Sequence, residues 1–175
     1  MFSHSVMRNA RRCETTGLLT GDDLSTKLPM HDTCRKSPDK PLRRRKGKTM
    51  ERQVIHTSKV PPAKVPLSQA IKTGGWVFAS GQLGMDPKTE RLAEGGIAIE
   101  TRQVCENLKA VLEAAGSSME KVAKVTIYMV DLSELAAMNA VFSEYFPKDP
   151  PARTTFQAAG LVGAARVEIE AIASA

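Results

Sequence analysis

Aromatic side chains divide this chain of 175 residues into two unequal parts. Seven of its eight aromatic residues lie after residue 49, and Phe2 is the exception. A segment with so few bulky apolar side chains buries too little surface to offset the entropy lost on ordering. We therefore expect residues 1–49 to be a disordered extension and residues 50–175, a typical length for one domain, to fold around one core.

Positive charge is concentrated in the same extension. Residues 1–49 carry twelve Lys and Arg against five Asp and Glu, whereas the whole chain has a formal net charge of +6. Residues 50–175 therefore have a net charge of −1, and they offer no basic field to a polyanion. Any weak attraction to nucleic acid is expected to come from residues 1–49.

Three interpretations of residues 1–49 remain open. The run PLRRRKGKTM at 41–50 is typical of a nuclear-import or polyanion-binding patch. The first dozen residues have the Arg and Ser content of a mitochondrial transit peptide, although the acidic residues that follow do not fit one. The third interpretation is that translation starts at Met50.

Residues 50–175 lack the sequence features of membrane, disulfide-bonded and metal-binding proteins. No apolar run approaches the roughly 18 residues that span a membrane, and no signal peptide opens the chain. Cys105 is the only cysteine of this part, so no internal disulfide is expected and a reducing compartment, the cytoplasm, is favoured. His56 is its only histidine and no metal-binding motif is present, so we expect no metal site.

Hydrophobic periodicity predicts two helices. Apolar residues recur at helical spacing over 95–116, and Gly116 stands where that helix should end. A second apolar stripe over 133–146 is stopped by Pro147. Between them, Ser117 and Glu120 have the spacing of a capping box.

Six strands are predicted around these helices. They fall at 51–59, 76–84, near Leu92, 122–132, 153–159 and 165–173. The apolar segment 76–84 is expected to be a buried strand that forms a hairpin with the strand near Leu92 around the turn MDPKTER. The stretch at 60–75 is interpreted as a proline-punctuated connection that ends in a Gly-Gly turn.

The order β-β-β-α-β-α-β-β predicts an α+β fold in which two helices cover one face of a mixed sheet. The strand 122–132 has apolar residues in both alternations, with Val125 and Ile127 on one face and Tyr128 and Val130 on the other. The second face of the sheet therefore also needs cover, and association between copies is the simplest way to provide it. A pocket is then expected where subunits meet.

Five motifs give the chain a resemblance to a known family. They are ASGQLGMDPKT, NLKAVLEAAGSSMEKVAKVTIYMVDL, MNAVFSEYF, PPARTTF and VEIEAIA, in this order between Lys64 and Ala173. In sequence and spacing they resemble the reactive intermediate deaminase family (Rid, also called YjgF), whose fold is similar to that of the trimeric, barrel-type chorismate mutase. The resemblance implies a homotrimer with active sites between subunits. It also implies hydrolysis of enamines and imines, such as 2-aminoacrylate, to 2-oxo acids and ammonia without a cofactor.

The resemblance also assigns catalytic roles to two residues. Arg153 of PPART matches the arginine that binds the substrate carboxylate, and Glu168 of VEIE matches the glutamate that holds the attacking water. The planar fork of a guanidinium suits a small 2-imino acid, and a carboxylate can handle protons in both steps of imine hydrolysis. Without the resemblance, Arg153 would be a surface ion-pair former, and Glu168 would be a solvated residue like Glu170, to which no role is assigned.

Further residues match positions around the family's pocket. They are Ser80, Gly81, Asn139 and Thr155, which the resemblance assigns to substrate binding. The ordinary alternatives are a strand-ending turn at Ser80 and Gly81 and an exposed helix residue at Asn139. Leu67 departs from the family, because many members have a tyrosine at this position, and this change puts the choice of substrate in doubt.

A rival hypothesis keeps the scaffold and changes the function. The domain would then be a small-ligand sensor or interaction protein, or it would act on RNA. The domain lacks a basic stripe with interleaved aromatic residues, which is the usual basis for binding RNA.

Overall fold

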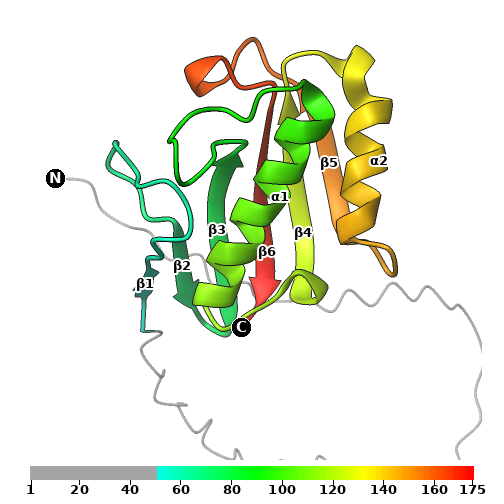
Figure 1. Ribbon diagram of the computed structural model, residues 1–175. Coiled ribbons are helices and arrows are strands. Elements are labelled where there is room, and N and C mark those ends of the chain that lie inside the picture. The colour runs from blue at the N-terminus through cyan, green and yellow to red at the C-terminus, as the bar shows by residue number, and fades with distance from the viewer. Residues whose placement is uncertain (1–50) are drawn as a thin grey trace, which may run out of the picture. The chain divides into compact units, whose positions relative to one another are not determined.

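The sheet and its two helices account for most of residues 51–175, the part of the chain that the computed structural model describes. Six strands form one sheet, and both helices lie side by side across one of its faces (Figure 1). The predicted α+β architecture is therefore confirmed. The interpretations of residues 1–49 lie outside the described residues and stay predictions.

The last strand of the chain occupies the centre of the sheet. The strands are β1 (Gln53–Ile55), β2 (Ala70–Thr73), β3 (Trp76–Leu83), β4 (Val122–Met129), β5 (Ala152–Gln157) and β6 (Val167–Ser174). Their order across the sheet is β1-β2-β3-β6-β4-β5. All neighbours are antiparallel except β4 and β5. These two run parallel because a helix returns the chain to the same end of the sheet between them.

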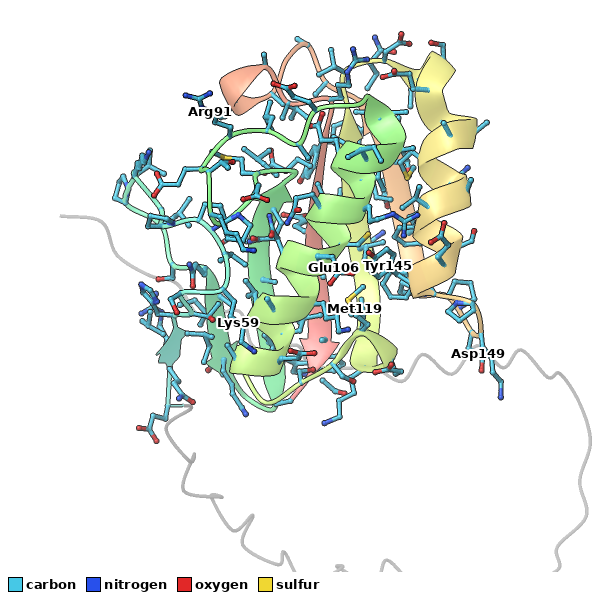
Figure 2. All side chains as sticks on the ribbon, in the orientation of Figure 1. Lys59, Arg91, Glu106, Met119, Tyr145 and Asp149 are labelled. Atoms are coloured by element: carbon cyan, nitrogen blue, oxygen red, sulfur yellow. The ribbon has the colours of Figure 1, made fainter. Side chains whose placement is uncertain are left out.

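The helices cover the face on which the core forms. They are α1 (Ile97–Ala114) and α2 (Leu135–Tyr145). Alternate residues of the central strands point toward them and are fully buried, among them Val125, Ile127 and Ile169. The exposed edges of the helices are also joined, because the Tyr145 hydroxyl donates a hydrogen bond of 2.6 Å to the Glu106 carboxylate (Figure 2).

Gly116 ends α1 as predicted. Its φ of 78° lies in the left-handed region, where glycine carries no steric penalty. The N–H of Ser117 donates to the carbonyl of Leu112 at 2.9 Å, and that of Gly116 donates to the carbonyl of Glu113 at 3.0 Å. These two bonds form a Schellman motif, which satisfies the last carbonyls of the helix.

The predicted hairpin around MDPKTER is confirmed as a turn closed by antiparallel contacts, but the strand expected near Leu92 does not form. Near Leu92 only one isolated bridge forms, to Met85, whereas Ala70–Thr73, interpreted as part of a connection, forms β2. Gly74 and Gly75, with φ of 59° and 82°, make the tight turn that folds β2 back on β3. Since β6 takes the other edge of β3, no edge remains for a strand near Leu92.

The capping-box prediction is also wrong. The Ser117 hydroxyl donates to the carbonyl of Ser174, so it ties the end of α1 to β6 instead of capping the following turn. That turn, Met119–Lys121, starts after Ser118 and has no side-chain cap. The local pattern assigned the Ser117 hydroxyl to the following turn, but the hydroxyl bonds to a residue that is distant in the sequence.

The face of the sheet away from the helices is open in the single chain. The strand 76–84 was expected to be buried, but only alternate residues of β3 are, and Trp76 and Phe78 are each 44% exposed. On the same face Tyr128 and Phe156 pack edge to face, with ring centroids 4.9 Å apart. This apolar surface is consistent with the predicted cover by other copies, which stays a prediction.

A buried carboxylate fixes the position of α1 against β6. Glu100 is 4% exposed, and one of its oxygens accepts the N–H of Arg166 at 2.7 Å and that of Val167 at 3.5 Å. Burial raises the pKa of Glu100 in spite of these bonds. The contact secures the start of β6 to the first turn of the helix.

We expect Glu100→Leu to lower the free energy of unfolding by about 1–3 kcal/mol, because it leaves buried N–H groups without an acceptor. Glu100→Gln keeps an acceptor and should cost less. Since the folded-state pKa is raised, the wild type should lose stability as pH rises from the unfolded to the folded pKa, and Glu100→Gln should reduce that loss. Urea unfolding over a pH series checks both results, and equal stability of the two variants would contradict the assigned role.

Candidate active site

A β-bulge in β3 forms the first part of the candidate site. Ala79 pairs with Ala171 and Gln82 pairs with Ile169, so Ser80 and Gly81 together stand opposite one residue of β6. Bulges turn the local backbone and are frequent beside active sites. The Ser-Gly pair therefore does not end the strand, as its simpler interpretation supposed, but bends it near its middle.

Glu168 lies directly against the bulge. A Cβ atom added to Gly81 would come within 1.8 Å of the Oε1 atom of Glu168, so only glycine leaves room for this carboxylate. The two residues predicted from separate motifs are thus brought together. Ser80 has a different task, because its hydroxyl donates to the carbonyl of Ser68 at 2.7 Å and holds the preceding loop.

The environment of Glu168 raises its pKa. Burial raises the pKa of this half-buried carboxyl, and the negative charge of Glu170 on the same face of β6 adds to the effect. Tyr128, the register partner of Glu168 on β4, also has a raised pKa, through burial and through Glu170. A carboxyl group whose pKa is moved toward neutrality can both accept and return a proton.

Arg153 is held by neutral partners on α2. One of its guanidinium nitrogens donates to the Oδ1 atom of Asn139 at 2.7 Å, and the guanidinium carbon lies 5.5 Å from the centre of the Phe142 ring. No carboxylate of residues 51–175 forms an ion pair with it. Arg153 and Asn139 are therefore brought together as predicted, and the arginine keeps its charge available for an anion.

Thr155 lies two residues beyond Arg153 on the same face of β5. Its Oγ1 atom is buried and has no hydrogen-bond partner among the described residues. Such a group costs stability unless something outside the chain pairs with it. We therefore keep Thr155 with Arg153 and Asn139 and call these three residues the arginine half-site.

The second group, Ser80, Gly81 and Glu168, is called the glutamate half-site, and it lies on the opposite face of the sheet. Arg153 pairs in parallel register with Val125, which is fully buried beneath the helices, so its side chain starts on the helix face. Glu168 pairs with Tyr128 on the open face. The predicted residues thus form two clusters, and a single chain does not bring Arg153 and Glu168 together.

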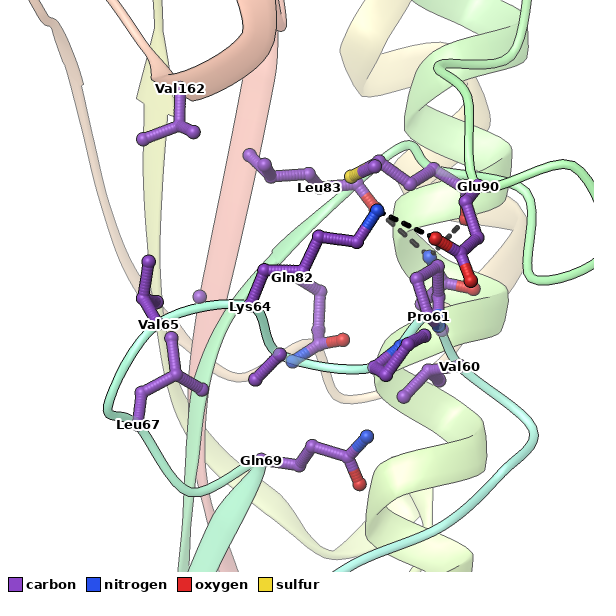
Figure 3. A pocket seen from close by; sticks show the side chains of 15 residues that line it. Val60, Pro61, Lys64, Val65, Leu67, Gln69, Gln82, Leu83, Glu90 and Val162 are labelled. Carbon is purple, nitrogen blue, oxygen red and sulfur yellow. Dashed lines mark hydrogen bonds and ion pairs between the residues drawn. The ribbon is translucent and has the colours of Figure 1, made fainter.

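A cavity beside the glutamate half-site was missed at the sequence level. It has a volume of about 250 Å³ and lies between the loop 60–67, the end of β3 and α1 (Figure 3). Gly81 lines it, together with the exposed apolar side chains of Val65, Leu67 and Val162. The only signal for it was the apolar content of the proline-rich stretch VPPAKVPL.

Comparison with known proteins identifies the domain. The family model described as Endoribonuclease L-PSP, of the YjgF/Rid family, matches residues 57–175. The chain belongs to this family. The family predicted from the five motifs is thus confirmed.

Individual relatives of this Rid domain agree with the assignment. It is 45% identical to a RutC family protein of Pyrococcus abyssi over 124 residues, which is 71% of this chain and 98% of the relative. It is 39% identical to the human 2-iminobutanoate/2-iminopropanoate deaminase over 122 residues, or 70% of this chain and 89% of the relative. The crystal structure of RidA from a Psychrobacter species is 44% identical, with a TM-score of 0.68, and covers 70% of this chain and 99% of its own.

Membrane-spanning helices and metal-binding clusters are both absent from residues 51–175 of the Rid protein. No helix there is both long and apolar enough to cross a membrane. No three His, Cys, Asp or Glu side chains of this part lie close enough together to hold a metal ion. His56 is exposed.

The contact between Gly81 and Glu168 can be tested as an energetic coupling. We expect Gly81→Ala to destabilise the protein by about 1 kcal/mol, because the new methyl group displaces the glutamate side chain. In a Glu168→Ala background the same substitution should cost much less, since contacting residues are not additive. Urea unfolding of the four proteins measures the coupling.

Gly160→Ala is the matched control, because a Cβ atom there meets no atom within 4 Å. It should leave stability nearly unchanged in both backgrounds. An equal cost of Gly81→Ala with and without Glu168 would contradict the contact.

Proposed function

We propose that this Rid protein hydrolyses enamines and 2-imino acids derived from amino acids to 2-oxo acids and ammonia, and that it needs no cofactor to do so. The observation that carries the proposal is the half-buried carboxyl of Glu168, which lies against Gly81 and has a raised pKa. Support also comes from relatives named 2-iminobutanoate/2-iminopropanoate deaminase and from the Escherichia coli TdcF structure, 33% identical, which contains bound serine.

The chemistry requires a held substrate, a positioned water and one group that moves protons. Arg153 binds the substrate carboxylate with the paired donors of its fork, in the orientation set by Asn139 and Phe142. Glu168 takes a proton from water as its oxygen adds to the imine carbon. The carboxyl group then returns this proton to the nitrogen, which gives a carbinolamine. In the second step it carries the hydroxyl proton of the carbinolamine to the nitrogen, so that the C=O bond forms, the C–N bond breaks, and ammonia and the 2-oxo acid leave.

We propose further that each active site is shared between two subunits of a homotrimer. The arginine half-site and the glutamate half-site lie on opposite faces of one sheet. One small substrate therefore cannot contact both half-sites of the same chain. A neighbouring copy can supply the missing half and can also cover the open face with its exposed Trp76 and Phe78.

Two substitutions separate binding from chemistry. Arg153→Lys keeps the charge but loses the planar two-point grip, so imine hydrolysis should fall by on the order of a hundredfold. Glu168→Gln removes the proton carrier but leaves the grip, so turnover should drop while a competing 2-oxo acid still binds. Ammonia release from enzymatically generated imino acids, with calorimetry of 2-oxo acid binding, checks both. A wild-type rate for Arg153→Lys would refute the assignment.

Mixing the two variants tests the sharing of sites. If subunits are co-expressed and assort at random in a closed ring, about a quarter of the sites receive an intact half from each partner, and the activity should recover to about that fraction. The sedimentation mass should equal three chains. If the mixture recovers no activity and the sedimentation mass equals one chain, the proposal of a site shared between subunits is wrong. Wild-type chains mixed with the double variant provide the control for assortment.

The rival function is ligand sensing or RNA binding by the same scaffold. The matching family model is described as an endoribonuclease, but residues 50–175 have a net charge of −1, which gives RNA little electrostatic attraction. Wild-type protein that binds a 2-oxo acid and hydrolyses no imine would favour the sensor. RNA binding that is lost when residues 1–49 are removed would belong to the basic extension.

A further inference from the structure

The cavity beside Gly81 gathers apolar side chains that are unusually exposed. Val162 is 76% exposed, Val65 is 60% exposed and Leu67 is 47% exposed, and all three line this one cavity. Single exposed apolar residues are ordinary on a protein surface, but a cluster around a hollow indicates a binding site. Two of the three come from the loop 60–67, and the third comes from the turn before β6 (Figure 3).

The walls of the cavity are fixed in the free chain. Gln69, which is 7% exposed, accepts the N–H of Thr57 at 2.7 Å and donates to its carbonyl at 3.1 Å, which closes the loop at its base. At the rim, Lys64 and Glu90 form an ion pair of 2.7 Å between this loop and the turn after β3. A preformed hollow loses little entropy when a ligand enters.

The side-chain amides that line the cavity already donate hydrogen bonds to backbone carbonyls of the chain. Asn107 on α1 donates to the carbonyls of Leu83 and Met85, each at 2.9 Å. Gln82 donates to the carbonyl of Ser80 at 3.0 Å. With these groups satisfied, the surface left for a ligand is mainly apolar, and an entering apolar group leaves none of them unpaired.

The cavity is next to the proposed chemistry. Gly81 is one of its lining residues, and the Glu168 carboxylate lies against the same glycine. A substrate whose reacting carbon is at Glu168 therefore has this hollow within reach of its side chain.

We propose that the cavity receives the substrate side chain and that it selects 2-imino acids with branched aliphatic side chains, such as the one formed from leucine, over those with a methyl group. The inference rests on the proposed imine hydrolysis. Leu67 and Val65 determine this preference, because they present hydrocarbon where a polar residue would favour a small or polar substrate. The reactions that supply such a substrate are two-electron oxidations of branched amino acids, which remove the α-hydrogen and one hydrogen of the amine nitrogen to form the C=N bond.

The test compares two imines in the full-length protein. An amino acid oxidase generates them in the assay from leucine and from alanine. The kcat/KM for the leucine-derived imine should exceed that for the alanine-derived imine by on the order of tenfold or more, because the larger side chain removes more hydrocarbon from water. Competition by 4-methyl-2-oxopentanoate and by pyruvate should show the same order of affinity.

Two substitutions make the cavity wall more polar. Val65→Thr keeps the shape of the side chain, and Leu67→Asn keeps its approximate size. Each should lower the leucine-to-alanine ratio of kcat/KM several-fold. Val54→Thr is the matched control, since Val54 is 53% exposed on β1 and does not line the cavity. It should leave the ratio unchanged.

The outcomes separate the two proposals. Equal kcat/KM values for the two imines, or a ratio that Val65→Thr and Leu67→Asn do not move, would overturn the side-chain site and leave imine hydrolysis standing. Hydrolysis of neither imine would overturn the proposed function. In that case the relative affinity of the two 2-oxo acids, and its response to the same variants, still decides whether the cavity selects branched side chains.

Discussion

The pairing of β6 on both of its edges is the constraint on which the rest of the structure depends. It bonds to β3 on one side and to β4 on the other, so it fixes the centre of the sheet. Because strand side chains alternate, burial of Val167 and Ile169 in the core forces Glu168 onto the open face. A slip of one residue would place the glutamate in the core, so the same apolar contacts that stabilise the fold also position the candidate catalytic carboxyl.

The parallel pairing of β5 with β4 has the opposite consequence for Arg153. The strand joins the edge of the sheet after α2 has crossed the helix face, and its register sets Arg153 beside Asn139 and Phe142 on that face. One half-site thus depends on the centre of the sheet and the other on its edge. A functional site assembled from both requires a second copy of the chain, and this makes association part of the proposed catalysis and not only a source of stability.

Features set by neighbours along the chain could be predicted from the sequence. The helical stripe of α1 and its end at Gly116 are of this kind, because both depend on residues within two turns. The strand expected near Leu92 was wrong because strand pairing is a competition between distant segments, and β2 and β6 hold both edges of β3. The division of Arg153 and Glu168 between two faces was equally beyond local patterns, since it follows from the register of β5 on β4. The family resemblance supplied the residues and implied sites between subunits, but it did not say which residue lies on which face of the sheet.

Three unfavourable features of the described chain lie at the two half-sites and on the open face. Glu168 is a carboxyl whose charged form is disfavoured by burial and by Glu170, Thr155 buries an unpaired hydroxyl, and Trp76 exposes an aromatic ring. Each would be selected against in a chain that worked alone, because each costs folding free energy without a partner inside the chain. Elsewhere, buried polar side chains such as Gln69, Asn107 and Glu100 have their partners, whereas the Oγ1 atom of Thr101 on α1 is a further buried group without one. A partner outside the chain, either a second subunit or a substrate, would offset the costs of Glu168 and Trp76 together, whereas a monomeric binding domain would leave these two without a common explanation.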